Sequence, residues 1–84
     1  MPRFFFHLRD ETGFVQDEEG REFDSLGEAR THALQGIRSI VSEDVKYGRI
    51  DLTGELEVAD ESGAALLTVG FGEAVEIHRG EQRG

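Results

Sequence analysis

The longest periodic stretch of the chain, residues 25–48, reads SLGEARTHALQGIRSIVSEDVKYG. It begins with the pattern of a capping box, in which the Ser25 hydroxyl accepts a hydrogen bond from a backbone N–H and Glu28 reaches back to the helix start. Apolar residues then recur every three or four positions: Leu26, Ala29, Ala33, Ile37, Ile40, Val41 and Val45, with Leu34 on the flank. Gly48 can adopt the left-handed conformation that ends a helix. The stretch therefore predicts one amphipathic helix of about 21 residues, roughly 32 Å long.

Short segments on both sides of this helix have the alternation and the aromatic and β-branched content typical of strands. The predicted strands cover residues 3–9, 14–16, 55–59 and 65–71. Residues 21–23 are expected to extend the first pairing, and residues 73–78 to form a last short strand or edge segment. The pattern Asp-Glu-x-Gly occurs at residues 10–13, 17–20 and 60–63. Its aspartate can bond the backbone two residues on and its glycine can adopt a positive φ, so each tetrad predicts a tight turn.

Together these elements predict a single α+β domain over residues 1–78, followed by a tail over residues 79–84. The expected order is β-β-α-β-β, an antiparallel sheet of about four strands with the long helix packed across one face. A chain of 84 residues is near the size at which a single core gives only marginal stability. A symmetric partner would add to that stability.

The other face of the predicted sheet carries the candidate partner-binding residues. The alternation in the first strand places Phe5 and His7 on this outer face, and Leu66 falls on it from the last long strand. A large aromatic residue there is either covered by another segment of the chain or offered to a partner. The outer face around Phe5, His7 and Leu66 is therefore the predicted surface for binding a second copy or another protein.

Composition narrows the classes of partner. The chain has 9 Lys and Arg against 18 Asp and Glu, a formal net charge of −9, which repels nucleic-acid phosphates and anionic membranes. There is no cysteine, so neither a disulfide framework nor a thiolate metal site is available. Cysteine content therefore does not indicate whether the protein lies in a reducing or an oxidising compartment. Neither a signal peptide nor a stretch of about 20 apolar residues is recognisable, so we expect a cytoplasmic protein with no membrane or nucleic-acid partner.

No motif of known chemistry is present. The sequence has no phosphate-binding glycine loop, no Gly-x-Ser-x-Gly and no His-Glu-x-x-His, and its serines and threonines lie at expected caps, turns or the polar helix face. His7, His32 and His78 fall on a strand, on the polar side of the helix and on the terminal segment, so they do not predict a shared metal site. We therefore expect neither an enzyme, nor a cofactor, nor a metal ligand set.

Several of these segments resemble one known family. The likeness rests on the opening Pro-Arg-Phe-Phe-Phe-His at residues 2–7, the acidic turn at 17–20, Leu26, Ala29, Arg30 and Ala33 in the helix, and the pattern from Val58 to Val75. It is similar, over residues 2–77, to a family of small bacterial proteins catalogued as a domain of unknown function. This resemblance implies one compact domain in a bacterial cytoplasm and implies no activity. Gly72 departs from the polar residue expected there, and Arg30 is expected to pair with the acidic turn before the helix.

The leading hypothesis is therefore a non-enzymatic interaction module, either a homodimer or an accessory subunit. The alternative is a small acidic regulator that binds a cation or ligand through the carboxylates between residues 10 and 24, although their spacing does not match a calcium loop. A third reading is an enzyme with an unrecognised site. A pocket lined by His7 and carboxylates would favour this third reading.

Overall fold

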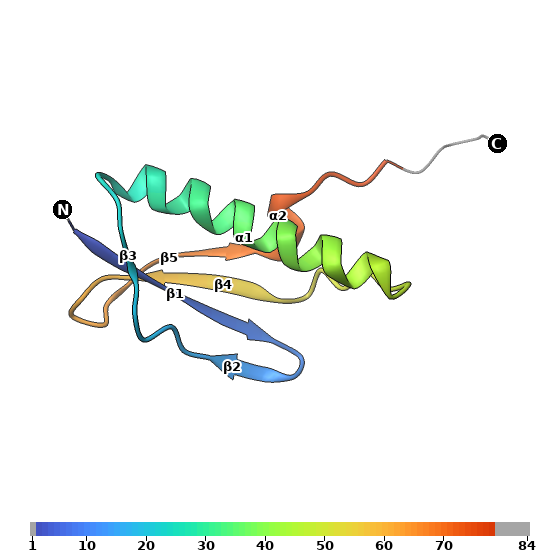
Figure 1. Cartoon of the computed structure of the whole chain (residues 1–84), viewed down its shortest axis with the longest axis horizontal. Coiled ribbons are helices and arrows are strands. Elements are labelled where there is room, and N and C mark those ends of the chain that lie inside the picture. Colours follow the sequence, from blue (N-terminus) through green and yellow to red (C-terminus); the bar gives the residue numbers. More distant parts are fainter. Residues whose placement is uncertain (1, 79–84) are drawn as a thin grey trace.

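The computed structural model describes residues 2–78, in which one long helix lies along one face of an antiparallel sheet (Figure 1). The elements in chain order are β1 (Arg3–Asp10), β2 (Gly13–Val15), β3 (Arg21–Glu22), α1 (Leu26–Lys46), β4 (Glu55–Ala59), β5 (Ala65–Gly70) and α2 (Phe71–Ala74). This arrangement confirms the predicted α+β class, the antiparallel sheet and the single long helix. The short helix α2 was not predicted, and the tail over residues 79–84 lies outside the described residues.

The sheet is built around β1 and β4, which pair along five positions. The strand order is β2-β1-β4-β5, with β3 pairing beside the first residues of β1 while β2 pairs beside its last ones. All four pairings are antiparallel. Directly opposed residues of antiparallel strands point to the same face. The register places Phe6, Val58 and Leu67 in one row on the helix side, and His7, Glu57 and Thr68 in the next row on the outer side.

The limits of α1 follow from its end residues. The Ser25 hydroxyl accepts a hydrogen bond from the Glu28 N–H at 3.2 Å, while Glu28 accepts one from the Asp24 N–H at 3.2 Å. At the other end, Tyr47 caps the helix and Gly48 takes a φ of +83°. Both ends therefore use the capping chemistry that the sequence predicts.

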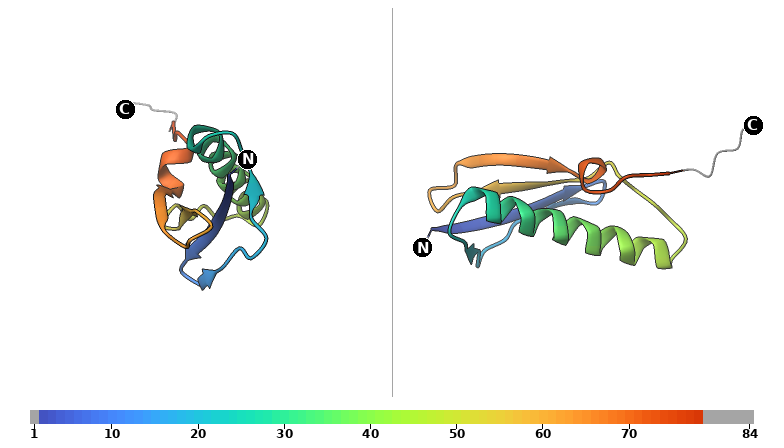
Figure 2. Two further views of the ribbon diagram at one scale, coloured as in Figure 1. Left: turned by 90° about the vertical axis from the view of Figure 1, so that its left-hand side faces the viewer. Right: turned by 90° about the horizontal axis from the view of Figure 1, so that it is seen from above.

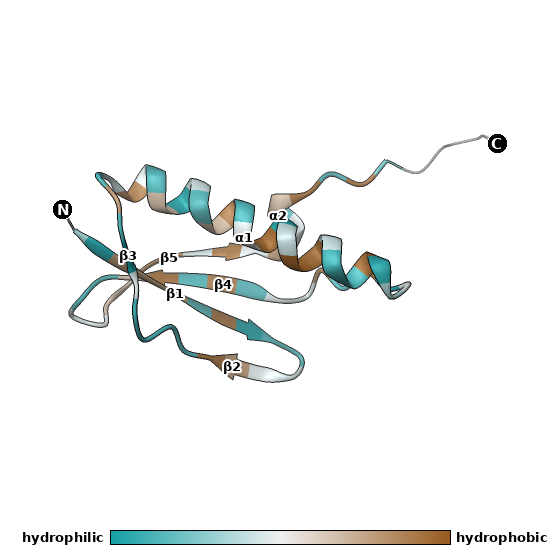
Figure 3. Cartoon of the chain, in the orientation of Figure 1, coloured by the Kyte–Doolittle hydropathy of each residue, from teal (hydrophilic) through white to brown (hydrophobic). Residues whose placement is uncertain are grey.

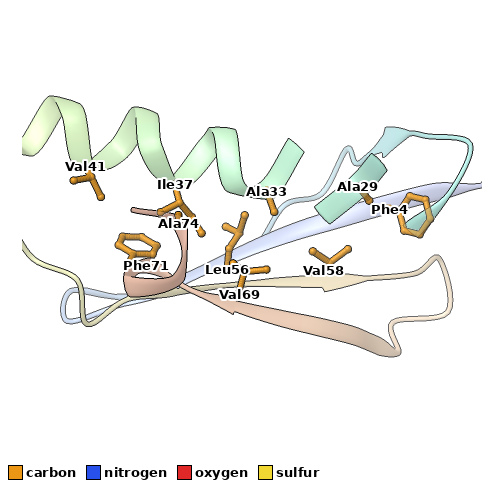
Figure 4. Close-up of a cluster of buried hydrophobic side chains, with 10 residues drawn as sticks. All are labelled: Phe4, Ala29, Ala33, Ile37, Val41, Leu56, Val58, Val69, Phe71 and Ala74. Atoms are coloured by element: carbon orange, nitrogen blue, oxygen red, sulfur yellow. The ribbon is translucent and has the colours of Figure 1, made fainter. Parts of the chain in front are cut away.

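The core lies between α1 and the helix side of the sheet (Figure 4). From α1 it receives one stripe: Ala29, Ala33, Ile37 and Val41. The two alanines have no exposed surface, and their small size lets the helix approach the strands closely. The apolar stripe on the sheet side of α1 is visible in Figure 3. Leu26 and Val45 belong to the predicted stripe but are 37% and 50% exposed. For Val45 the reason is that the end of α1 extends past the strands (Figure 2).

Residues 73–78, expected to form a last short strand or edge segment, do not form a strand, and the strand expected to end at Phe71 stops at Gly70. The chain instead forms one helical turn, α2, and residues 75–78 have no regular secondary structure. Phe71 and Ala74 are both 3% exposed. A strand would place these two residues on opposite faces, whereas a helical turn places them on the same side, so burial of both favours the helix. The Phe71 N–H also donates to the Gly54 carbonyl at 2.9 Å.

Two arginines of α1 contact α2. The Arg38 Nε donates to the Ala74 carbonyl at 2.6 Å. The Arg30 guanidinium lies 3.9 Å from the Glu73 carboxylate, so the expected pairing of Arg30 with the acidic turn before the helix is wrong. The acidic partner of Arg30 therefore comes from α2, which contacts α1.

Replacing Gly36, in the middle of α1, should stabilise the protein. A Cβ built at this residue meets nothing within 4 Å, so alanine adds helix propensity without a clash. Gly36→Ala is expected to raise the free energy of unfolding by about 0.5–1 kcal/mol in urea denaturation. The matched control is Gly48→Ala, which should destabilise the chain because φ is +83° at that residue. A loss of stability in Gly36→Ala would contradict the helix packing described above.

Candidate functional site

The sheet face opposite α1, called the outer face below, collects the side chains that the core does not use. Its rows follow from the strand register: Arg9 lies opposite Glu55 and Phe14, and His7 lies opposite Glu57. The Arg9 guanidinium lies 4.9 Å from the centre of the Phe14 ring and forms ion pairs with Glu55 at 3.1 Å and Glu57 at 3.8 Å. An arginine on this face is thus held between an aromatic ring and carboxylates.

The segment between β2 and β3 covers part of the outer face, and Asp17 holds it there. The Asp17 carboxylate accepts hydrogen bonds from three backbone N–H groups: Phe6 at 3.1 Å, Glu19 at 3.1 Å and Gly20 at 3.2 Å. The first of these bonds joins the segment to β1, and the other two shape the turn itself. The tetrad at residues 17–20, predicted as a turn, therefore also serves as a cover for β1.

The Asp17 carboxyl group stays ionised at neutral pH. Partial burial alone would raise its pKa, but the N–H groups of Phe6, Gly20 and Glu19 together outweigh burial and hold the pKa below the usual 3.8. Asp17 is thus a charged anchor for the segment at neutral pH.

His7 lies beneath this segment and is only 9% exposed. Its Nδ1 accepts a hydrogen bond from the Asp17 N–H at 3.0 Å, so the neutral ring carries its proton on Nε2. Within residues 2–78, Nε2 has no hydrogen-bond partner. Phe5, on the same face, is half-buried, and a Cβ at Gly20 would lie 2.8 Å from its ring. Two of the three predicted residues therefore lie together under the chain's own segment.

A hollow of about 280 Å³ opens beside these two residues. It is lined by Phe5, His7, Gln16, Asp17, Glu18, Asp60, Glu61 and Gly63, and is called the outer hollow below. Two of the three Asp-Glu-x-Gly tetrads meet here, each contributing one aspartate and one glutamate. The third predicted residue, Leu66, lies on β5 outside this lining and is 40% exposed.

Among the described residues, none of the four carboxylates of the outer hollow forms an ion pair with lysine or arginine. Asp60 resembles Asp17 in that it bonds its own turn: hydrogen bonds from Ser62 and Ala64 lower its pKa below 3.8. Glu18 and Glu61 are exposed. The outer hollow therefore combines negative charge, an aromatic wall and one buried N–H donor.

A second hollow, of about 240 Å³, lies between the β1–β2 turn and the end of α1. Its walls carry four carboxylates from Asp10, Glu11, Asp44 and Asp51. They surround Arg49, whose Nη2 lies 2.7 Å from Glu11 and 3.1 Å from Asp51. The second hollow is therefore neutralised in part by a cation of the chain itself.

The expected placement of the histidines is correct only in part. His78 is exposed and lies 3.1 Å from Glu76. His32, expected to be solvated, packs instead against Phe6 and Phe23 with ring centres 4.9 and 5.1 Å away. Burial first, and the charge of Arg21 second, lower the pKa of His32 below 6.5. Over residues 2–78 no group of three or more His, Asp or Glu residues is arranged to hold a metal ion.

The comparisons with known proteins identify a family and nothing more specific. The model of a domain of unknown function, DUF6894, matches residues 3–72. The chain belongs to the DUF6894 family. Searches of the curated proteins and of the solved structures find no match for this DUF6894 chain. In its described part, none of its helices has the length and apolar character needed to cross a membrane.

Gly20 should be the most sensitive of the turn glycines. Gly20→Ala must tolerate both a φ of +71° and a Cβ that lies 2.9 Å from the Phe4 carbonyl oxygen and 2.8 Å from the Phe5 ring. Gly63→Ala is the matched control, because its φ is +91° and its Cβ meets nothing within 4 Å. We expect Gly20→Ala to cost about 1–3 kcal/mol more than Gly63→Ala in urea denaturation. Equal costs would show that residues 17–20 do not pack on Phe5.

The Asp17 anchor should make stability depend on pH. Because its pKa is lower in the folded chain than the unfolded value of 3.8, the unfolded chain binds more protons in acid. Its contribution is present above pH 3.8 and is lost as the pH falls through the lowered folded value. Asp17→Asn presents either an amide N–H₂ or a weaker acceptor to the Phe6 N–H. It should lower the free energy of unfolding by about 2 kcal/mol at pH 7. It should also make the free energy of unfolding, measured in urea titrations, depend less on pH in acid. Glu43→Gln on α1, with the same charge change, should do neither.

Proposed function

We propose that this DUF6894 chain is a non-enzymatic interaction module that binds a partner protein through its outer face. The observation that carries this proposal is that α1 covers one side of the sheet only (Figure 1). The outer face has a hollow and exposed apolar side chains. Phe14 is 49% exposed and Leu66 is 40% exposed on this face. Aromatic and aliphatic side chains of this kind are the usual anchors of protein interfaces.

The free edge of β5 supports the same proposal. β5 ends the strand order, and its six residues, Ala65–Gly70, include neither a charged residue nor a proline. Uncharged edge strands offer their backbone N–H and C=O groups to another chain, and many proteins protect such edges with lysine or proline. Leu66 lies on this strand, so a partner that contacts it also reaches the edge.

Charge favours a different protein over a second copy. Each copy has a formal net charge of −9, and two outer faces brought together would oppose their carboxylates. We therefore favour the accessory subunit over the homodimer. A bacterial cytoplasmic setting is part of the proposal and is supported by the resemblance to small bacterial proteins.

The outer hollow is lined by His7 and carboxylates, which is the kind of pocket that would favour the hypothesis of an enzyme. A carboxyl group that donates a proton near neutral pH needs a pKa raised toward neutrality. Asp17 and Asp60 have lowered pKa values because they bond backbone N–H groups. Among the lining residues there is no serine, threonine, lysine or tyrosine to act as a nucleophile. Binding therefore accounts for the outer hollow better than catalysis does.

The alternative of a cation-binding regulator receives less support. Of the carboxylates between residues 10 and 24, Glu11 pairs with Arg49, Glu22 pairs with Arg3 at 3.3 Å, and Asp17 bonds the backbone. These groups point to separate parts of the molecule and already have partners. We therefore do not favour a shared cation for them.

Photo-crosslinking in cells tests the proposed module. A photo-reactive amino acid in place of Leu66 should form an adduct with one protein, whereas the same group in place of Gln35, exposed on α1, should not. The purified partner should then bind Leu66→Asp about tenfold more weakly than the unaltered chain. An adduct of twice the mass of the chain would identify a second copy as the partner. Adducts that are the same at both positions, or absent at both, would contradict use of the outer face.

A further inference from the structure

The outer hollow and the second hollow differ in one respect that points to a ligand. Each is lined by four carboxylates, but only the second hollow contains a guanidinium, that of Arg49. No lysine or arginine lines the outer hollow. Carboxylates without a basic side chain of their own chain beside them are available to attract a cation from another molecule.

The outer face already contains one bound arginine side chain, that of Arg9. Arg9 lies over the Phe14 ring at 4.9 Å and pairs with two glutamates. The outer hollow offers the same kinds of group on the same face, with Phe5 as the aromatic ring and the glutamates Glu18 and Glu61 exposed at its margin. A planar guanidinium suits both a ring and carboxylates better than a compact ammonium group does.

His7 adds an independent requirement. It is more than nine-tenths buried in the wall of the outer hollow, and its Nε2–H has no partner within residues 2–78. A buried donor without an acceptor is unfavourable, so the ligand should also bring an acceptor oxygen. A peptide supplies both groups, because the carbonyl oxygens of its backbone lie close to each side chain.

We propose that the outer hollow binds an arginine side chain from an extended, basic segment of the partner protein, with a backbone carbonyl of that segment accepting from His7 Nε2. This inference rests on the proposed interaction module and names the chemistry of its partner. The carboxylates of Asp17 and Asp60 are held by their turns, which leaves Glu18 and Glu61 free to close on the guanidinium. The site thus combines two carboxylates held by their turns with two exposed ones.

The probe is a capped peptide, acetyl-Gly-Gly-Arg-Gly-Gly-amide, titrated into the ¹⁵N-labelled full chain at low salt and followed by NMR. The control peptide contains citrulline, which has the shape of arginine without its charge. We expect millimolar binding of the arginine peptide, with shifts in the amides of residues 16–20 and 60–63 and in His7 Nε2. The citrulline peptide should bind at least tenfold more weakly.

A pair of double variants separates the site from the general charge of the chain. Glu18→Gln with Glu61→Gln should weaken peptide binding about tenfold. Glu43→Gln with Glu76→Gln raises the net charge equally but alters exposed residues outside the lining, so it should change binding less than twofold. Equal weakening in both pairs, equal binding of citrulline, or no shift around the outer hollow would overturn the inference. If Leu66 still crosslinks to a partner in that case, only the arginine chemistry fails; if it does not, the interaction module fails too.

Discussion

A single helix can cover only one face of the five-stranded sheet, and the rest of this structure is arranged around that limit. On the covered face, Ala29 and Ala33 bring α1 close enough to bury Val58 and Val69 almost completely. On the other face the chain has only short segments available. It uses residues 16–20 to cover Phe5 and His7, and it pairs Arg9 with Phe14 and two glutamates. What these leave exposed is the surface to which we assign a partner.

Asp17 links the cover to the candidate site. Its carboxylate fixes the segment to β1, and its N–H selects the tautomer of His7 that leaves a donor on Nε2. One residue therefore determines both how much of the outer face is buried and which hydrogen bond the outer hollow can offer. Because Asp17 bonds three backbone groups, these two properties are set by the fold and do not depend on a mobile side chain.

The sequence predicted the elements whose causes are local. The caps at Ser25 and Gly48 and the alternation in residues 55–59 each depend on neighbours a few residues away, and all three were predicted correctly. The helix α2 depends on the hydrogen bond from Phe71 to Gly54 and on packing against α1, so no local sequence pattern predicts it. His32 was misjudged for the same reason, because its neighbours Phe6 and Phe23 come from outside the helix.

The candidate site shows the same division between local and distant causes. The alternation in β1 correctly put Phe5 and His7 on one face, but it could not show that residues 17–20 fold over them. The repeated Asp-Glu-x-Gly tetrads were the available signal, and they were interpreted as turns or, between residues 10 and 24, as carboxylates for a cation or ligand. Two of them lie in the same hollow because β1 pairs with β4, a contact between residues about fifty positions apart.

The two hollows differ in how their carboxylates are neutralised. The second hollow contains the guanidinium of Arg49, whereas no lysine or arginine of the described residues lines the outer hollow, so of these two hollows only the outer hollow has carboxylates without a basic partner. A cationic partner that binds only the folded chain would stabilise the fold by mass action. In the proposed module, binding and folding are therefore coupled through the carboxylates of the outer hollow.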